Sequence, residues 1–438
     1  MITWKLRKGA AYKKGHPWAF AKDLEIEADR VQPGSFVRIV SDKNEVLDFG
    51  YGNPRCALAF RSLPLLQHPK LAAMASVGPG SADFQAWVRE SIVAAWKRRE
   101  SLGFRGSYRL VFSEADGLPG LILDRYELAG DQPGEIGQVL AAQILTAGFD
   151  RIWGDGLELM RGVVELKGGD WAKTVVVERK DVSIRKVEGL EVLAPRVLHA
   201  GAGWTPEKLA HASVRMASQA PGDDSYVTLT ADLFEGQKTG FFLDQSWNMR
   251  LVQGLLADMK LSRLRVLDLC SYVGHWSLQL GNLARRQGAD FHADLVDVSA
   301  SALARASANL SAAGLASAAF ELDVLKDIDA WPKGPYDVVI ADPPAFVKAK
   351  KDLPQGQHAY LKLNTEAAKR VAPGGLLISC SCSGAVSEED LAQAVAKAAA
   401  RVGRRATILG RGQQGADHPW LTNFPEGRYL KMQITRLD

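Results

Sequence analysis

The chain has 438 residues, of which 47% are hydrophobic and 24% are charged, a composition within the ordinary globular range. It excludes disordered and collagen-like classes, and no apolar run reaches the roughly 18 residues that a transmembrane helix needs. Net charge is only +4, and four cysteines are too few for a disulfide framework or a zinc knuckle. We therefore expect several folded domains in a reducing cytoplasm, with no metal site and no membrane contact.

The first 66 residues contain short strand-like runs at 35–40, 46–51 and 57–61, separated by Gly, Asn and Pro. Short strands with turn residues between them are typical of a small all-β barrel. The first 22 residues hold no acid but several cations, namely Lys5, Arg7, Lys8, Lys13, Lys14 and Lys22. Such a segment on a near-neutral chain predicts a contact with a polyanion, and a solvated charged surface is the alternative.

A linker-like stretch at 76–82 is followed by a helical pattern with Asp83 as its N-cap and Gly103 after its end. Further along, we expect a helix at 138–147 and strands at 108–112, 121–124, 174–178 and 182–185. These elements predict a compact α+β central domain over residues 76–195.

From residue 196 onward, apolar strands alternate with helices, which predicts an α/β fold with a doubly wound, mostly parallel sheet. A hairpin is expected from 227–231 and 239–243. The strands of the sheet are expected at 264–270, 291–298, 318–323, 336–342, 375–380, 406–409 and 429–435. The domains expected are therefore 1–66, 76–195 and 196–438.

Ligands of such a sheet bind beyond the carboxyl ends of its strands. Asp268 and Gly274 follow the first strand, Asp297 ends the second and Asp323 ends the third. Asp268 would hold a cationic group, Asp297 would accept both hydroxyls of a ribose, and Asp323 would accept an adenine amino group. Because the loop lacks the G-x-G-x-x-G pattern of pyrophosphate sites, these residues predict S-adenosylmethionine as the cofactor.

The fourth strand ends in Asp342-Pro343-Pro344, where two prolines stiffen the backbone and leave carbonyls available to a base edge. Cys382 follows the fifth strand. A thiolate there can add to C6 of a pyrimidine, whereas the alternative is a small buried apolar residue. Cys270 and Cys380 are expected to be core residues.

Taken together, these motifs resemble the RlmI-type rRNA (cytosine-5) methyltransferases, a family with an N-terminal PUA domain. The matching segments are 8–20, 114–120, 182–189, 238–245, 269–274, 296–299, 342–344, 381–384, 416–419 and 424–427. Two positions depart from the family pattern: Ala345 follows the prolines where Lys is usual, and Ser246 follows Gln245 where Arg is usual.

The resemblance implies a Rossmann-like class I methyltransferase sheet, seven-stranded and mostly parallel, preceded by a PUA β-barrel and a small α+β domain. It implies formation of 5-methylcytosine in 23S rRNA of the large ribosomal subunit. Cys382 would be the nucleophile, Asp342 would protonate N3 of the base, and Glu426 would remove the C5 proton. The cofactor-binding residues would be Gln245, Asp268, Ser271, Tyr272, Gly274, Asp297, Asp323, Asp342 and Pro343. The RNA-binding residues would be Lys5, Arg7, Lys8, Lys13, Lys14, His16 and Trp18.

Three other functions stay open. A methyltransferase acting on an exocyclic base nitrogen needs no thiol and often carries an aromatic directly after the two prolines, where this chain has Ala345. A non-catalytic RNA-binding ribosome-assembly factor would keep the fold without the reaction. An NAD-dependent oxidoreductase is disfavoured by the missing phosphate loop.

Overall fold

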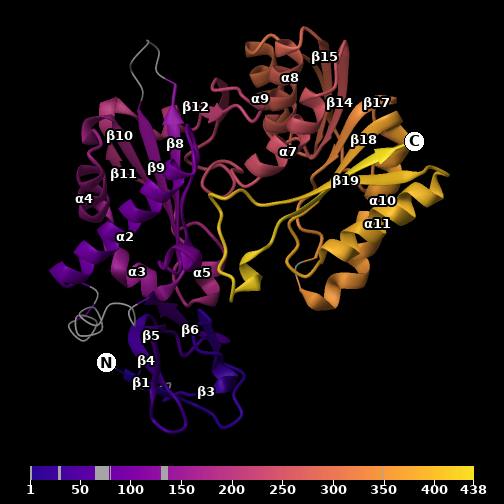
Figure 1. Ribbon diagram of the computed structural model, residues 1–438. Helices are drawn as coiled ribbons and strands as arrows, with labels where there is room; N and C mark the ends of the chain where they lie inside the picture. Colours follow the sequence, from indigo (N-terminus) through magenta and orange to yellow (C-terminus); the bar gives the residue numbers. More distant parts are fainter. Residues whose placement is uncertain (1, 28–30, 65–77, 79, 130–136, 348) are drawn as a thin grey trace. The chain divides into compact units, whose positions relative to one another are not determined.

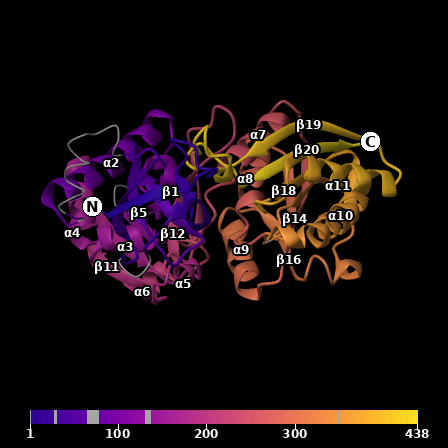
Figure 2. The same ribbon diagram turned by 90° about the horizontal axis from the view of Figure 1, so that it is seen from below.

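The computed structural model describes residues 2–27, 31–64, 78, 80–129, 137–347 and 349–438. The chain forms two compact units, seen in two views in Figures 1 and 2. The N-terminal unit comprises Met1–Ala212, Asp232–Phe242 and Asp417–Gly427, and the C-terminal unit comprises Ser213–Ala231, Leu243–Ala416 and Arg428–Asp438. The division into three domains stays a prediction, and its boundary residues 66 and 76, with linker residues 77 and 79, lie outside the described residues.

The N-terminal unit begins with a six-stranded sheet in the order β2-β6-β5-β4-β1-β3. Its strands are β1 (Ile2–Leu6), β2 (Trp18–Phe20), β3 (Leu24–Glu25), β4 (Ser35–Val40), β5 (Val46–Gly52) and β6 (Leu58–Leu63). Along β4, Val37 and Ile39 are fully buried while Arg38 between them is exposed, as the alternation of a strand requires. The three strands expected in this region are confirmed.

A second sheet follows, with β11-β10-β9-β8 in order and β7 paired to β8. Its strands are β7 (Tyr108–Phe112), β8 (Leu121–Leu128), β9 (Gln138–Ile144), β10 (Thr174–Arg179) and β11 (Arg196–Ala200). The helices of this part are α2 (Ala82–Ser101), α3 (Ala147–Trp153), α4 (Leu157–Lys167), α5 (Ile184–Val187) and α6 (Pro206–Leu209).

Four expectations for these regions are wrong. Residues 138–144 form β9, not a helix, because this strand lies between β8 and β10 with both faces buried and therefore lacks an alternating pattern. Residues 184–187 form the short helix α5 instead of a strand. Residues 239–243 form no strand, since Lys238 and Gly240 adopt positive φ there. The N-cap of α2 is Ser81, not Asp83, because the Ser81 side chain accepts the Phe84 N–H.

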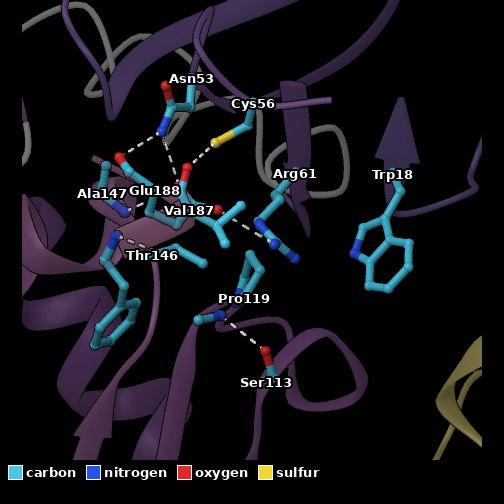
Figure 3. A network of polar contacts seen from close by, with 12 residues as sticks. Trp18, Asn53, Cys56, Arg61, Ser113, Pro119, Thr146, Ala147, Val187 and Glu188 are labelled. Carbon is cyan, nitrogen blue, oxygen red and sulfur yellow. Dashed lines mark hydrogen bonds and ion pairs between the residues drawn. The ribbon is translucent and has the colours of Figure 1, made fainter. Parts of the chain in front are cut away.

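Buried polar contacts join the first sheet to the rest of the N-terminal unit (Figure 3). Asn53 Nδ2 donates to Oε2 of Glu188 at 2.9 Å, and Arg61 Nη2 lies 3.4 Å from Oε1 of the same carboxylate. Arg61 Nη1 also donates to Oε1 of Glu114 at 2.7 Å, and Trp18 Nε1 donates to that same oxygen at 2.7 Å. The two carboxylates share the one Arg61 guanidinium, so losing any member of the network removes a partner from the others.

The C-terminal unit contains a seven-stranded sheet in the order β16-β15-β14-β17-β18-β20-β19. Its strands are β14 (Arg263–Leu269), β15 (Asp290–Asp297), β16 (Ala316–Glu321), β17 (Tyr336–Ala341), β18 (Val371–Ser381), β19 (Ala406–Gln413) and β20 (Lys431–Leu437). The first five strands in that order pair in parallel, and β20 is antiparallel to both of its neighbours. All seven of these strands fall where the sequence predicted them.

Before this sheet, the hairpin strands β12 (Ala212–Ala217) and β13 (Tyr226–Ala231) pair with each other. The helices of the unit are α7 (Ser246–Ala257), α8 (His275–Arg286), α9 (Ala300–Ala312), α10 (Leu353–Arg370) and α11 (Glu388–Arg401). Apolar residues of α10 and α11 pack on the sheet in one buried cluster, and the two helices lie side by side (Figure 2). Among the described residues, no helix is both long and apolar enough to cross a membrane.

Replacing Glu114 with Ala should lower the free energy of unfolding of the N-terminal unit by roughly 1–3 kcal/mol, because Trp18 Nε1 and the Arg61 guanidinium lose an acceptor, although Arg61 keeps Glu188 at 3.4 Å. Urea denaturation followed by tryptophan fluorescence measures this. The matched control is Glu165→Ala, which removes an exposed ion pair with Arg161 and should cost less than about 1 kcal/mol. Equal losses in the two variants would contradict the role given to the network.

The same carboxylate makes stability depend on pH. Burial alone would raise the pKa of Glu114, but the Arg61 guanidinium and the Ser113 and Trp18 donors lower it below its usual value. The contribution of Glu114 to the free energy of unfolding should therefore be complete above its pKa in the unfolded state, about 4.3. It should be lost as the pH falls through the lower pKa of the folded state. In Glu114→Ala, this loss of unfolding free energy at low pH should be absent.

Candidate active site

The carboxyl ends of five parallel strands meet at one edge of the C-terminal sheet. Asp268 lies near the end of β14, Asp297 ends β15 and Asp342 directly follows β17. Cys382 directly follows β18, which neighbours β17. The topology thus gathers residues that are far apart in the sequence.

Asp268 is fully buried, and the Ser277 hydroxyl donates to its Oδ2 at 2.7 Å. Burial, together with the carboxylates of Asp342 and Asp297, raises the pKa of Asp268 to about 7, although the Ser277 hydroxyl opposes the shift. Its Oδ1 has no hydrogen-bond partner within the described part of the chain. A buried acceptor without a donor is costly, so a cationic ligand beside it would be favourable.

Burial and neighbouring carboxylates both act on the Cys270 thiol. Burial is the main reason that the pKa of the Cys270 thiol lies well above its usual value. Four neighbouring carboxylates raise it further, those of Asp297, Asp342, Asp268 and Asp323. The partly buried thiol packs against the core, in keeping with the expected role of Cys270 as a core residue.

The backbone of the loop after β14 adopts positive φ values at three positions. Cys270 and Tyr272 have positive φ values of 63° and 49°, and Gly274, at φ 82°, is the N-cap of α8. A Cβ at Gly274 would lie 3.0 Å from Leu310 Cδ1, so glycine lets this loop pack closely on α9. The buried Ser271 hydroxyl has no hydrogen-bond partner among the described residues, which makes it available to a ligand.

Asp297 fixes this loop from the neighbouring strand. Its Oδ2 accepts the Tyr272 N–H at 2.9 Å and its Oδ1 accepts the Ser299 N–H at 2.9 Å. Each oxygen keeps a second lone pair for a ribose hydroxyl. The next residue, Val298, is 64% exposed and offers an apolar surface beside the carboxylate that the sequence analysis did not single out.

Asp323 is held mainly by its own turn. The Lys326 ammonium lies 2.9 Å from Oδ2, and the Leu325 N–H donates to Oδ1 at 2.9 Å. These contacts lower the pKa of Asp323, the Lys326 hydrogen bond contributing most. The structure thus places Asp323 at the same edge as the other acids but already bonded to neighbours.

Gln245 and Asp342, expected to lie together at the cofactor, do contact each other. Gln245 Nε2 donates to Asp342 Oδ2 at 2.7 Å, and Trp276 Nε1 donates to the same oxygen at 3.3 Å. Asn248 Nδ2 in turn donates to Gln245 Oε1 at 2.6 Å. Trp276 and Asn248 were not predicted, because only the fold brings them to the carboxylate.

Cys382 and Cys380 have different environments, as the sequence predicted. Cys380 lies within β18 and is fully buried, whereas Cys382 lies beyond the end of the strand and is partly exposed. The Cys382 thiol lies 3.9 Å from the carbonyl oxygen of Pro343. The thiol therefore stands beside the Asp-Pro-Pro segment.

The residues expected to bind RNA lie in the N-terminal unit. The side chains of Arg7, Lys8, Lys13 and Lys14 are exposed, and Lys5 is partly exposed on β1.

His16 and Trp18 instead contact the segment 417–427 of the same unit. The His16 ring lies 3.6 Å from the Glu426 carboxylate, and the Trp18 ring packs edge-on against Phe424 with centroids 4.5 Å apart. Glu426 thus belongs to the N-terminal unit and Cys382 to the C-terminal unit.

Comparison with known proteins identifies the family. A family model described as a PUA-like domain matches residues 2–63, and one described as an S-adenosylmethionine-dependent methyltransferase matches residues 224–406. Ribosomal RNA large subunit methyltransferase I of Pseudoalteromonas atlantica is 31% identical over 432 residues, 96% of this chain and 95% of that protein. The chain belongs to the ribosomal RNA large subunit methyltransferase I family.

Other proteins agree with this assignment. The ribosomal RNA large subunit methyltransferase of Deinococcus radiodurans is 32% identical over 439 residues, 97% of this chain and 94% of that protein. The crystal structure of the methyltransferase SMU.776 complexed with SAH has a TM-score of 0.71 at 16% identity, and the match covers all of both chains. A methyltransferase structure from Streptococcus mutans has a TM-score of 0.69 at the same identity and full coverage of both chains. These structures show the fold that this family member shares.

S-adenosylmethionine is the cofactor of the methyltransferase domain, and the strand-end residues fit it. The buried, unpartnered Oδ1 of Asp268 suits a cationic group, and the unpartnered Ser271 hydroxyl suits a polar one. The loop that carries Ser271 packs closely on α9 at Gly274. The individual cofactor contacts, including those of Tyr272, Asp297, Asp323 and Pro343, remain predictions.

Replacing Asp297 with Ala should weaken S-adenosylmethionine binding by about ten- to hundred-fold, since two ribose hydroxyls lose a charged acceptor worth roughly 1–3 kcal/mol. Calorimetric titration measures the change. The matched control is Asp290→Ala, which removes an exposed carboxylate at the opposite end of the same strand and should bind like wild type. Wild-type affinity in Asp297→Ala would show that the ribose lies elsewhere.

Proposed function

We propose that this protein methylates C5 of a cytosine in 23S rRNA of the large ribosomal subunit, using S-adenosylmethionine, in the cytoplasm. The names of its relatives support an rRNA substrate of the large subunit. A Rossmann-like class I sheet, mostly parallel and seven-stranded, agrees with the strand order described above. The observation that carries the cytosine-5 chemistry is the Cys382 thiol, partly exposed at the end of β18 and 3.9 Å from the Pro343 carbonyl.

C5 of cytosine is a weak nucleophile, so the base must be activated before it can take a methyl group. In the proposed reaction the Cys382 thiolate adds to C6, and Asp342 delivers a proton to N3, which leaves an enamine-like carbon at C5. S-adenosylmethionine supplies the electrophilic methyl group. S-adenosylhomocysteine is the leaving group. Glu426 then takes the C5 proton, the bond from the Cys382 sulfur to C6 breaks to restore the aromatic ring, and N3 returns its proton to Asp342.

Strand order supports this assignment of roles. The cofactor loop follows β14, Asp342 follows β17 and Cys382 follows β18, and these strands are immediate neighbours. The acid and the nucleophile therefore flank one point next to the proposed cofactor site. The side chain of Phe346 packs on Tyr360 with centroids 4.9 Å apart, which speaks against a stacking role in exocyclic-nitrogen methylation.

The exposed cations at the start of the chain support RNA binding by the PUA-like domain. Lysine and arginine side chains that neutralise phosphates release counterions, which makes affinity depend on salt. Because His16 and Trp18 contact the 417–427 segment, the phosphate contact rests on the flanking cations Arg7, Lys8, Lys13 and Lys14.

Cys382→Ala should abolish methyl transfer to rRNA, because without addition at C6 there is no activated carbon. Transfer of radiolabelled methyl groups to rRNA from a strain lacking the enzyme measures the rate. S-adenosylmethionine affinity and thermal unfolding should stay near wild type. The matched control is Cys380→Ala, which should lose stability through a small cavity yet keep turnover. If Cys382→Ala still transfers methyl groups, methylation of an exocyclic nitrogen is favoured. If the wild-type protein transfers none, a non-catalytic RNA-binding factor is favoured.

Replacing Lys8, Lys13 and Lys14 together with Gln should weaken RNA binding and flatten its dependence on salt. Each lost phosphate contact should reduce the slope of log K against log salt by about 0.7–0.9. The matched control replaces Lys260, Lys333 and Lys397, three exposed lysines of the C-terminal unit, with the same loss of charge. Identical slopes in the two triple variants would mean that the basic segment is only a solvated surface.

A further inference from the structure

A buried lysine that the proposed reaction does not use lies next to the Cys382 segment. Lys431 is the first residue of β20 and pairs with Ser381, the last residue of β18. Its Nζ donates to the Ser383 carbonyl at 2.6 Å and to the Tyr429 carbonyl at 2.8 Å, and the residue is only 5% exposed. Burying an ammonium costs free energy, so this position calls for an explanation beyond stability.

Buried hydroxyl groups also hold this segment. The Ser381 hydroxyl donates to the Tyr360 oxygen at 2.8 Å, and the Tyr360 and Ser383 hydroxyls lie 3.1 Å apart. The Ser383 oxygen also accepts the Val347 N–H at 3.1 Å, from the segment that follows the two prolines. Both neighbours of Cys382 are therefore fixed, and Lys431 completes the support through the Ser383 carbonyl.

The groups that face Lys431 leave its charge available to the thiol. Burial lowers the pKa of Lys431 to about 8, while Cys382 and the carboxylates of Glu388 and Asp390 raise it and Arg428 lowers it. Glu388 is already paired with Arg428 at 2.6 Å.

Asp390 also has partners of its own, since it accepts the Ser387 N–H in the capping box of α11 and a bond from Gln357. Within the described residues Lys431 makes two hydrogen bonds and no ion pair of its own.

We propose that Lys431 is a positioning residue for Cys382, orienting it through the Ser383 carbonyl and stabilising its thiolate with a positive charge. The inference rests on the proposed role of Cys382 as the nucleophile. The S–H proton passes to water, and the sulfur lone pair that remains forms the bond to C6. A cation near a thiol favours the thiolate, which is the reactive form. The effect should be present below about pH 8, where Lys431 carries its proton, and fade above it.

The test measures the reactivity of the thiol without any methyl transfer. The rate at which iodoacetamide alkylates Cys382 is followed in the full-length protein from pH 6 to 10, with the modified peptide quantified by mass spectrometry. Lys431→Gln keeps a donor for the carbonyls but loses the charge, and Lys431→Arg keeps the charge. The matched control is Lys369→Gln, an exposed lysine of α10 paired with Glu366. Thermal unfolding reports whether each variant is folded.

Lys431→Gln should alkylate about tenfold more slowly than wild type at pH 7 and reach the same rate at high pH, which is the signature of a thiol pKa raised by about one unit. Lys431→Arg and Lys369→Gln should follow the wild-type profile below pH 8.

A wild-type profile in Lys431→Gln would overturn the proposal and leave only a structural role for Lys431. If Lys431→Gln does not fold, folded Lys431→Arg decides. Alkylation that matches wild type below pH 8 and exceeds it just above pH 8, where the guanidinium keeps its charge, supports the proposal. A wild-type rate at every pH, or a tenfold loss, overturns it. Failure of the proposed function is a separate result, an active Cys382→Ala enzyme.

Discussion

The parallel pairing of β14, β17 and β18 is the constraint on which the rest of the site depends. Leu269 pairs with Ala341, and Ala341 pairs with Ser379, so the three strands reach the edge of the sheet almost in step. The residues that follow, the 270–274 loop, Asp342 and Cys382, therefore emerge side by side. A change of register in β18 would move the thiol away from the Asp-Pro-Pro segment even if every side chain were kept.

Two opposite electrostatic environments adjoin at this edge. On the side of β14 and β15, burial and neighbouring acids raise the pKa of Asp268 to about 7, which is a cost that a cationic cofactor would offset. On the side of β18, the buried ammonium of Lys431 and the hydroxyls around Tyr360 surround the segment that carries the thiol. The first environment suits binding of a sulfonium and an ammonium group, and the second suits formation of a thiolate. Because the two environments lie at neighbouring strands of one sheet, the acids can bind the cationic methyl donor while the ammonium of Lys431 stabilises the thiolate.

Sequence patterns predicted the C-terminal sheet well because its strands are apolar runs separated by helices with clear ends, such as the Ser387–Asp390 capping box. They failed where burial removes the pattern. Residues 138–144 are buried on both faces, so this strand lacks the alternation of polar and apolar residues, and its sequence therefore predicted a helix. Residues 239–243 have the composition of a strand, but Lys238 and Gly240 turn the backbone there. The acids at the strand ends could be predicted from topology, whereas the contacts of Trp276 and Lys431 depend on tertiary packing that no local pattern records.

The central claim is that the Cys382 sulfur forms a covalent bond to the target base. The most direct measurement uses rRNA that contains 5-fluorocytosine, incubated with wild-type enzyme and S-adenosylmethionine, because fluorine cannot leave as the C5 proton does. The account predicts a stable protein–RNA complex whose proteolytic peptide carries the methylated, fluorinated nucleotide on Cys382. Methylated RNA without such an adduct, or an adduct on another cysteine, would contradict it.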